Sequence, residues 1–412
     1  MVAARYSRPM AVSFEPFDPT IFDDPYPTYA QLRAHAPLYR GPTHKFWTLS
    51  RFADIKAALA DYQLYSSDIV RGGIGITPEE AGGADLPEHA HELPAGNLIV
   101  MDPPRHTAYR KPIAKRFLQK NMAPFETTVR EVVDRLIDSF IDKGSADIVD
   151  DFAGAVPALV FADVLGVPQS SYRDLHRWAA ELTTVPTTSE GAARHQEAVA
   201  SVAALFAEML PYKQANPADD LLTDMAMATG EDATYSARDF IGMATSMLIA
   251  GNDTTANLLA SAIYLFAKYP DQRARLVDDP SLMGNAVEEI LRYEPPVHGL
   301  ARVLTRDTEL YETLLSEGDK VLLLYAAGNR DERVFDDSET FDVGRDITQH
   351  LSFGHGVHYC VGLHLGRLES RIALGAFLER LPDYDVALDD IHWRHIFATR
   401  QMKSLPITFA PR

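Results

Sequence analysis

The chain has 412 residues, of which 46% are hydrophobic and 24% charged, a composition close to the average for globular proteins. Its net charge of −19, from 39 Lys and Arg against 58 Asp and Glu, argues against nucleic-acid binding over its general surface. The single cysteine, Cys360, excludes a disulfide-built secreted scaffold. The longest apolar stretch, residues 241–251, is shorter than the roughly 20 residues of a spanning helix. The N-terminus lacks the apolar core of a signal peptide, so we expect a cytoplasmic protein without a membrane anchor.

The N-terminal part of the chain is rich in proline, which disfavours long helices. Residues 45–49 predict a short strand and residues 51–60 a short helix. Residues 71–97 contain many glycines and prolines and predict a long loop, of the kind that often covers a functional site.

From about residue 124 onward, helical patterns dominate the sequence. Apolar residues recur at helical spacing in the segments 125–142, 171–183, 191–210, 236–268, 282–293 and 361–380. Strand-like segments are few and lie at 300–305, 320–325 and 405–409. We therefore predict a mainly α protein with a small β part, and we see neither a linker nor an internal repeat. A single domain is expected over 1–412, with a β-containing part at about 1–70 and a helix-rich part at about 98–380.

The segment 236–268 predicts one long, buried helix. Ser236 and Asp239 form a capping-box-like start, Pro270 marks the far end, and apolar residues occupy nearly all faces between them. Such a helix is about 45–50 Å long and would cross the molecule. Its middle, residues 250–255, reads Ala-Gly-Asn-Asp-Thr-Thr. Small and polar residues destabilise the centre of a buried helix, which indicates either a functional site or a cluster of interhelical hydrogen bonds.

Three interpretations compete for the segment around Cys360. The first is a buried structural cysteine, which is common for a free thiol. The second is a zinc site, although the available spacing suits no usual zinc ribbon or finger; its ligands would be His355, His358, Cys360 and His364. The third is a thiolate ligand to haem iron. It rests on the pattern F-x-x-G-x-H-x-C-x-G, formed by Phe353, Gly356, His358, Cys360 and Gly362.

Physical chemistry favours the thiolate interpretation. A metal-ligating sulfur is ionised, and hydrogen-bond donors or a helix N-terminus lower the pKa of a thiol. Cys360 is predicted to open the helix at 361–380. Gly356 and Gly362 allow the backbone to approach closely and aim N–H groups at the sulfur, and Phe353 can shield it from water.

This segment resembles the cysteine-ligand loop of the cytochrome P450 family. Glu289 to Arg292 resembles the family's E-x-x-R motif, and residues 250–254 its A-G-x-D/E-T motif. Residues 102–110 resemble its D-P-P-x-H-x-x-x-R segment, and residues 329–345 the meander before the cysteine. The order and spacing of these motifs match over roughly residues 100 to 380. The chain thus resembles a soluble bacterial-type P450, and we expect the P450 fold with its long central helix.

The resemblance implies a haem b cofactor whose iron is ligated by Cys360. A thiolate ligand donates electron density to the iron and so favours O–O cleavage. It implies haem-propionate partners at His106, Arg110, Arg302 and His358. It also implies that Ala250 and Gly251 keep bulk away from the iron.

Two further assignments follow from the same resemblance. Asp253 and Thr254 correspond to the family's acid–alcohol pair, in which Thr254 bonds back to the carbonyl of Ala250 and Asp253 relays protons. Glu289 and Arg292 would form a structural network with an arginine of the meander, either Arg345 or Arg330.

The chain carries no flavin or iron–sulfur signature, so the resemblance implies a separate ferredoxin and an NAD(P)H-dependent ferredoxin reductase. Residues 105–120 contain six Lys and Arg and no Asp or Glu, which suits docking of an acidic ferredoxin but also fits propionate binding and ordinary solvation. The predicted docking patch consists of Lys111, Lys115, Arg116 and Arg367.

The substrate is expected to be an apolar small molecule. Its pocket is predicted from Met247, Ala250, Thr254, Val297, His298, Leu300 and part of 71–97, with His298 as a polar handle. An alkyl, terpenoid or sterol-like lipid is favoured, and an aromatic or natural-product substrate stays open.

Together these features predict a monomeric haem-thiolate monooxygenase that inserts one atom of O₂ into a C–H bond. A peroxide-driven haem peroxygenase is an alternative, but such members usually lack the acid–alcohol pair. A non-enzymatic haem-thiolate binding protein is a second alternative, and it would need no proton relay.

Overall fold

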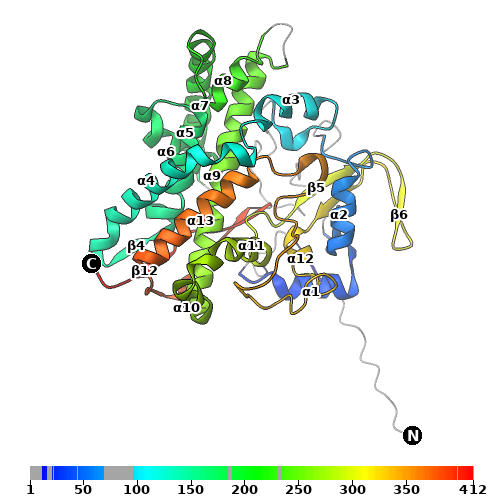
Figure 1. Ribbon diagram of the computed structural model, residues 1–412. Helices are drawn as coiled ribbons and strands as arrows, with labels where there is room; N and C mark the ends of the chain where they lie inside the picture. The colour runs from blue at the N-terminus through cyan, green and yellow to red at the C-terminus, as the bar shows by residue number, and fades with distance from the viewer. Residues whose placement is uncertain are drawn as a thin grey trace.

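The computed structural model describes residues 12–15, 21, 23–43, 45–68, 96–183, 188–230, 234–396 and 398–411. Over these residues the chain is mainly helical with a small β part, as the sequence predicts (Figure 1). The predicted loop at 71–97 lies outside the described residues, apart from its last two positions.

Long helices dominate the left and centre of Figure 1, strands β5 and β6 lie with α1 and α2 on the right, and β4 and β12 lie at the lower left near the C-terminus. The helices are α1 Tyr26–His35, α2 Phe52–Ala60, α3 Arg105–Ala114, α4 Ala123–Phe140, α5 Ala155–Leu165, α6 Tyr172–Thr183, α7 Ser189–Ala215, α8 Leu221–Ala226, α9 Ala237–Lys268, α10 Pro270–Asp278, α11 Met283–Tyr293, α12 Tyr325–Gly328 and α13 Leu363–Arg380.

The strands form one five-stranded sheet and three smaller pieces. The strands are β1 Leu38–Arg40, β2 Trp47–Leu49, β3 Tyr65–Ser66, β4 Ser145–Asp147, β5 Leu300–Leu304, β6 Thr308–Leu310, β7 Thr313–Leu315, β8 Lys320–Leu323, β9 Asp385–Val386, β10 Trp393–Ile396, β11 Thr399–Met402 and β12 Pro406–Thr408. The large sheet has the order β1-β2-β8-β5-β3, in which only β2 and β8 run parallel. The others are the sheet β4-β12-β9 and the hairpins β6–β7 and β10–β11.

Helices with a clear apolar period were predictable, and the predicted segments correspond to α4, α6, α7, α9, α11 and α13. Helix α5 was missed because it is buried on nearly every side and therefore has no polar face to set a period. Helix α1 forms in spite of the surrounding prolines. Pro25 and Pro27 lie at its first positions, where no intrahelical N–H bond is lost.

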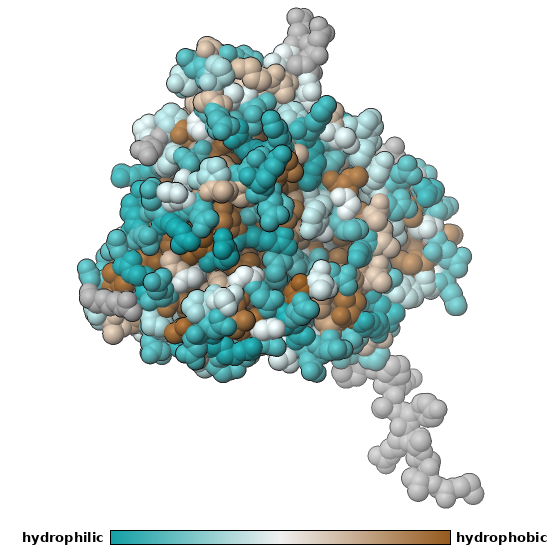
Figure 2. All heavy atoms as spheres, in the orientation of Figure 1, coloured by the Kyte–Doolittle hydropathy of each residue, from teal (hydrophilic) through white to brown (hydrophobic). Residues whose placement is uncertain are grey.

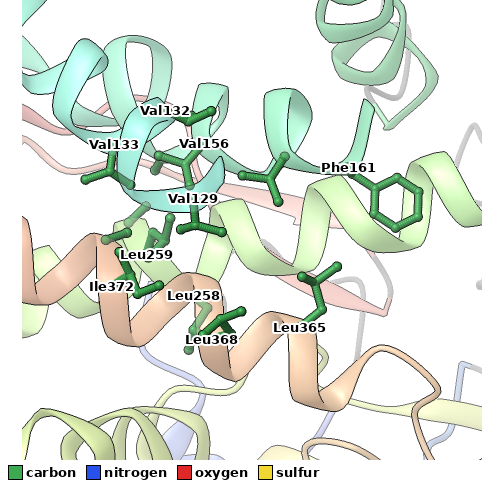
Figure 3. Packing of buried hydrophobic residues seen from close by; sticks show 14 of the residues in the cluster. Val129, Val132, Val133, Val156, Phe161, Leu258, Leu259, Leu365, Leu368 and Ile372 are labelled. Carbon is green, nitrogen blue, oxygen red and sulfur yellow. The ribbon is translucent and has the colours of Figure 1, made fainter. Parts of the chain in front are cut away.

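Helix α9 passes through the middle of the molecule (Figure 1). It has 32 residues, and the predicted capping box of Ser236 and Asp239 is present at its start. It packs against α5, α7 and α13. Figure 3 shows the resulting core, in which Leu258 and Leu259 of α9 lie among apolar side chains of α4, α5 and α13. Each fully buried side chain of this kind stabilises the fold by roughly 1.5–3 kcal/mol, so the core fixes the start of α13 relative to the centre of α9.

Hydrophilic residues dominate the face seen in Figure 2, and hydrophobic residues lie between them in separate patches. In the part of the chain that the structure describes, no helix is long and apolar enough to cross a bilayer.

A buried ion-pair network joins α11 to the meander, residues 329–345. Glu289 and Arg292 are fully buried and form two hydrogen bonds of 2.7 and 2.8 Å. Arg292 also donates to meander carbonyls, and Glu289 accepts from the backbone N–H of Asp342. Arg345 is the third member, with Nε 3.3 Å from Glu289 Oε1. Arg330 instead contacts Glu339 and the carbonyl of Tyr293.

We predict that Glu289→Ala destabilises the protein by about 3–5 kcal/mol, because it leaves Arg292 buried without its counter-charge. Glu126→Ala is the matched control, since Glu126 pairs with Arg130 at 3.0 Å on the exposed side of α4; an exposed pair of this kind contributes about 0.5 kcal/mol or less. The urea midpoint of unfolding measures both. Equal losses in the two variants would contradict the structural role of the buried pair.

Candidate functional site

The cysteine loop, residues 350–362, is held in place by backbone contacts. The N–H of Cys360 donates to the carbonyl of Phe353 at 2.9 Å. Gly356 has a φ of +68°, and a Cβ there would lie 2.5 Å from the carbonyl oxygen of Leu59. The glycine is therefore needed for the close approach of the loop to the end of α2, rather than for contact with the sulfur.

Cys360 lies three residues before α13, which begins at Leu363 and not at the cysteine as predicted. Its sulfur accepts hydrogen bonds from the backbone N–H groups of Gly362 and Leu363, at the N-terminus of the helix. A Cβ at Gly362 would have no described atom within 4 Å, so the loop leaves open space beside the cysteine.

The environment of Cys360 does not by itself lower the pKa of the thiol, contrary to the sequence-based expectation. Burial raises this pKa, while the two N–H bonds and the charges of Arg110 and Arg367 act in the opposite direction without outweighing it. A bound metal cation deprotonates a coordinating thiol outright. The two N–H groups and the two arginines would stabilise the sulfur as a thiolate, and a bound iron would supply the charge needed to ionise it.

Four predicted propionate partners come together beside the cysteine loop. The rings of His106 and His358 lie 4.4 Å apart, and the charges of Arg302 and Arg110 both act on His358. Burial and the charge of Arg110 lower the pKa of His106 to about 4, and burial with the charges of Arg302 and Arg110 lowers that of His358 to about 2. Arg110 also donates to the carbonyl of Tyr359 at 2.5 Å and so ties α3 to the loop.

This cluster fits the two carboxylates of a haem. Both ring nitrogens of His106 and Nε2 of His358 are buried without a hydrogen-bond partner among the described residues. Buried polar groups in native proteins are nearly always satisfied, so unpartnered nitrogens beside two arginines call for an anionic, hydrogen-bonding ligand. Two haem propionates have that chemistry, and the residues present therefore fit the cofactor that the sequence resemblance implies.

A stripe of half-buried residues lies on the central turns of α9. Its members Ile249, Ala250, Asp253 and Thr254 recur at helical spacing in a helix that is otherwise largely buried. The stripe marks the side of α9 on which protein atoms leave space. A Cβ at Gly366, in the first turns of α13, would lie 3.8 Å from Oγ1 of Thr255, the residue after Thr254, so α9 contacts the start of the helix that follows the cysteine loop.

The acid–alcohol pair has the geometry that the sequence predicts for Thr254. Its hydroxyl donates to the carbonyl of Ala250 at 2.8 Å, while α9 stays α-helical through this turn. The carboxylate of Asp253 accepts a hydrogen bond of 2.7 Å from the amide of Gln401 on β11. Sequence reasoning missed Gln401, because no local pattern places it beside Asp253.

Gly251 has a packing role that the sequence did not predict. A Cβ at this position would lie 2.6 Å from the ring of Phe161, so the glycine is required where α9 packs against α5. Gly251 and Ala250 are both half-buried, and their contribution to keeping bulk away from the iron stays a prediction.

The predicted pocket residues do not all face one space. Met247 is buried on α9, while Val297 and Leu300 are half-buried around the start of β5. His298 is buried between Tyr29, 3.3 Å from its Nδ1, and Glu294, 3.5 Å from its Nε2. These contacts assign His298 a structural role in place of the predicted contact with substrate.

Two of the four residues in the predicted docking patch have their positive charges compensated by nearby carboxylates. Arg116 is paired with Asp219 at 2.9 Å and Asp224 at 2.7 Å. Arg367 forms two bonds of 2.6 and 2.7 Å to Glu288, so its charge is compensated as well. Lys111 and Lys115 are exposed.

Beside the cysteine loop the surface is hollowed into a groove of about 730 Å³, whose lining includes Lys56, Gln349, His355 and Tyr359. The zinc interpretation has no geometric support. Within the described ranges, no group of three or more His, Cys, Asp or Glu side chains could hold a metal ion.

Comparison with known families and proteins gives consistent matches. The family model for cytochrome P450 matches residues 78–383. The cytochrome P450 monooxygenase PikC of Streptomyces venezuelae is 35% identical over 393 residues, covering 93% of this chain and 91% of the relative. The vitamin D(3) 25-hydroxylase of Pseudonocardia autotrophica is 32% identical over 403 residues, covering 96% of each.

Solved structures match the fold over nearly the whole chain. CalO2 superposes with a TM-score of 0.86 at 30% identity, covering 97% of this chain and 99% of that one. A myxobacterial cytochrome P450 in complex with myristic acid gives 0.85 at 31% identity, with the same coverage. The chain therefore belongs to the cytochrome P450 family of haem-thiolate monooxygenases, which bind haem b through a cysteine, and Cys360 is its only cysteine.

Proposed function

We propose that this P450 inserts one atom of O₂ into a C–H bond of an apolar small molecule, with electrons from a separate ferredoxin and an NAD(P)H-dependent reductase. The observation that carries the proposal is the acid–alcohol pair on the half-buried stripe of α9, a helix that contacts the start of the helix after the cysteine loop. A partner system fed by NAD(P)H also accords with a cytoplasmic location.

Each group of site residues has a separate role in this reaction. Haem, when bound, supplies the activation of dioxygen. Cys360 holds the iron, and the His106, Arg110, Arg302 and His358 cluster neutralises the propionates. The Thr254 hydroxyl, which donates to the carbonyl of Ala250, would be the last donor before dioxygen. Asp253 takes protons from water and passes them toward Thr254 as a general acid.

The same pair separates the proposal from its alternatives. A haem-thiolate binding protein has no use for a proton donor on the stripe, and a peroxide-driven peroxygenase usually lacks the pair. Both groups are in place here, with Thr254 bonded to Ala250 and Asp253 held by Gln401.

For the substrate we favour an alkyl or sterol-like lipid. Ile249 and Ala250 on the stripe are apolar, and so are the half-buried Val297 and Leu300. One relative is a vitamin D(3) 25-hydroxylase, and among the similar solved structures one P450 is bound to myristic acid and another to testosterone. The reassignment of His298 to the structure removes the one polar handle predicted for the pocket, which also favours an apolar ligand.

For the redox partner we propose docking at Lys111 and Lys115, beside the arginine that ties α3 to the cysteine loop. Arg116 and Arg367 are left out because their charges are compensated by Asp219, Asp224 and Glu288. The two lysines are exposed and form no ion pair within the described part of the chain, which suits an acidic partner even though the net charge of the protein is −19.

We predict that Cys360→His abolishes the far red-shifted Soret band of the reduced, carbon monoxide-bound protein, since only thiolate ligation produces it. His355→Ala is the control, because His355 lies on the same loop without being a proposed ligand, and it should keep the band. Absorption spectra of the two purified variants decide the matter. A thiolate-type spectrum in Cys360→His would show that the ligand is wrongly assigned.

We predict that Thr254→Ala keeps fold, haem content and substrate binding but lowers product formed per NAD(P)H by roughly tenfold, the loss of about one hydrogen bond in proton transfer. The NAD(P)H that is consumed without forming product should yield hydrogen peroxide instead. Asp253→Asn should instead slow the whole cycle by roughly 10²–10⁴-fold.

Thr245→Ala is the matched control for this test. The Thr245 hydroxyl bonds back to the carbonyl of Ile241 at 2.9 Å on the same helix, so its loss removes the same kind of bond. Product and NAD(P)H are measured together, with a substrate found by its shift of the ferric Soret band. Full coupling in Thr254→Ala, or equal uncoupling in both threonine variants, would refute the relay.

We predict that Lys111→Glu combined with Lys115→Glu slows reduction by ferredoxin without altering substrate binding. Lys143→Glu, an exposed lysine beyond the far end of α4, is the charge-matched control and should leave the reduction rate unchanged. Reduction should also slow with rising ionic strength, since exposed charges are screened beyond about 10 Å at 0.1 M salt. Stopped-flow reduction rates test this, and a salt-independent rate would argue against the patch.

A further inference from the structure

The hairpin β10–β11 places a buried amide against the proton-relaying residue of α9. Gln401 is 5% exposed, and its Nε2 donates to Asp253 Oδ2 at 2.7 Å and to Thr399 Oγ1 at 3.1 Å. The first contact joins residues 148 positions apart in the chain, so it is made by the tertiary fold alone.

The backbone around Gln401 is fixed by its neighbours. Arg400 forms a bond of 2.7 Å to Glu294, donates to the carbonyl of Asp23 at 2.7 Å, and stacks 3.3 Å over the ring of Trp393. Met402, on the other side, is buried in the main core. A side chain between two such anchors has little freedom, so the position of its amide is set by the fold.

The same hairpin contacts the segment that follows α11. Thr399 forms an antiparallel bridge with Val297, and the N–H of His298 donates to the carbonyl of Ala398 at 2.8 Å. Because Val297 is proposed to line the substrate pocket, the hairpin lies between that pocket segment and the acid on α9.

We propose that Gln401 is a positioning residue, whose amide holds the carboxylate of Asp253 in the orientation from which it delivers protons. This inference rests on the proposed function, in which Asp253 is the acid. An amide is well suited to the task, because its N–H donates a hydrogen bond to a carboxylate oxygen but the amide does not itself titrate. Proton transfer is therefore left to Asp253, and Gln401 determines only where its carboxyl group is held.

The first test uses two substitutions at one position. Gln401→Leu keeps the apolar bulk and removes the donor, so product formation with the Soret-screen substrate should fall about tenfold, as for loss of one hydrogen bond to a charged group. Gln401→Glu keeps the shape but faces Asp253 with a second carboxylate. Two carboxylates at hydrogen-bond distance share a proton, so this variant should change the pH profile of product formation.

Gln214→Leu is the control for the substitution itself. The Gln214 amide donates to the carbonyls of Ala226 and Thr229, near the end of α8, and its loss should leave rate and pH profile as in the unmodified protein. Substrate binding, followed by the Soret shift, should stay within about twofold in all three variants, because none of them removes a proposed pocket residue.

The second test needs no turnover. Melting temperatures are compared for Gln401→Leu, Asp253→Ala and the double variant. If the two side chains interact directly, the double variant loses less than the sum of the single losses, because the shared bond can be removed only once. Strictly additive losses would overturn the inference.

The role of Asp253 as proton donor and the role of Gln401 in positioning it can be refuted separately. If Asp253→Asn keeps full rate and coupling, Asp253 is not the proton donor, and both the relay and its positioning are refuted. If Asp253→Asn is slow while Gln401→Leu keeps normal rate, coupling and pH profile, the relay stands and only the role of Gln401 is overturned.

Discussion

The centre of helix α9 must be buried in the core and must also carry polar residues, and the arrangement of the site follows from these two requirements. Helix α9 is the longest helix described and is packed between α5 and α13, so its central turns are surrounded by protein. Those same turns carry Asp253 and Thr254, which are unfavourable in an apolar interior. The structure meets both requirements by leaving Asp253 and Thr254 half-buried, while Asn252, Thr255 and most of the apolar residues further along the helix are buried.

Buried charge is treated in two different ways in this protein. At Glu289 and Arg292 the chain supplies counter-charge, carbonyls and backbone N–H groups, so the network is satisfied from within and can hold α11 and the meander together. At His106 and His358 it supplies donors and cations, but ring nitrogens there have no hydrogen-bond partner among the residues that the structure describes. The first arrangement stabilises the protein on its own, whereas the second becomes favourable when an anionic ligand provides the acceptors. The contrast distinguishes a structural cluster from a binding site even where both are buried.

Interactions between residues close together in the chain could be predicted from the sequence, whereas interactions between distant residues could not. The capping box of Ser236 and the bond from Thr254 to Ala250 span three and four residues, and both are present as predicted. The partners of Arg116 and Arg367 lie more than seventy residues away along the chain, so local composition suggested a free basic patch that the fold partly neutralises.

Glycine positions show the same limit. A motif identifies the glycine but not the atom that excludes a side chain, which is Leu59 O for Gly356 and the Phe161 ring for Gly251. The family resemblance predicted some long-range contacts that local patterns cannot, because the order of the motifs is tied to one fold. It gave Arg345 as one of two candidates for the buried network, and Arg345 is the one that contacts Glu289.

The stretch between α11 and β5 links these separate parts. Glu294 pairs with Arg400, Val297 bridges to Thr399, and Arg302 belongs to the cationic cluster beside the cysteine loop. Within nine positions the chain thus connects the end of the E-x-x-R helix to the hairpin that carries Gln401 and to the propionate partners. The stability of the buried network, the lining of the pocket and the orientation of the acid on α9 therefore share one short backbone segment. A substrate that displaces this segment would act on the acid through the hairpin, without touching α9.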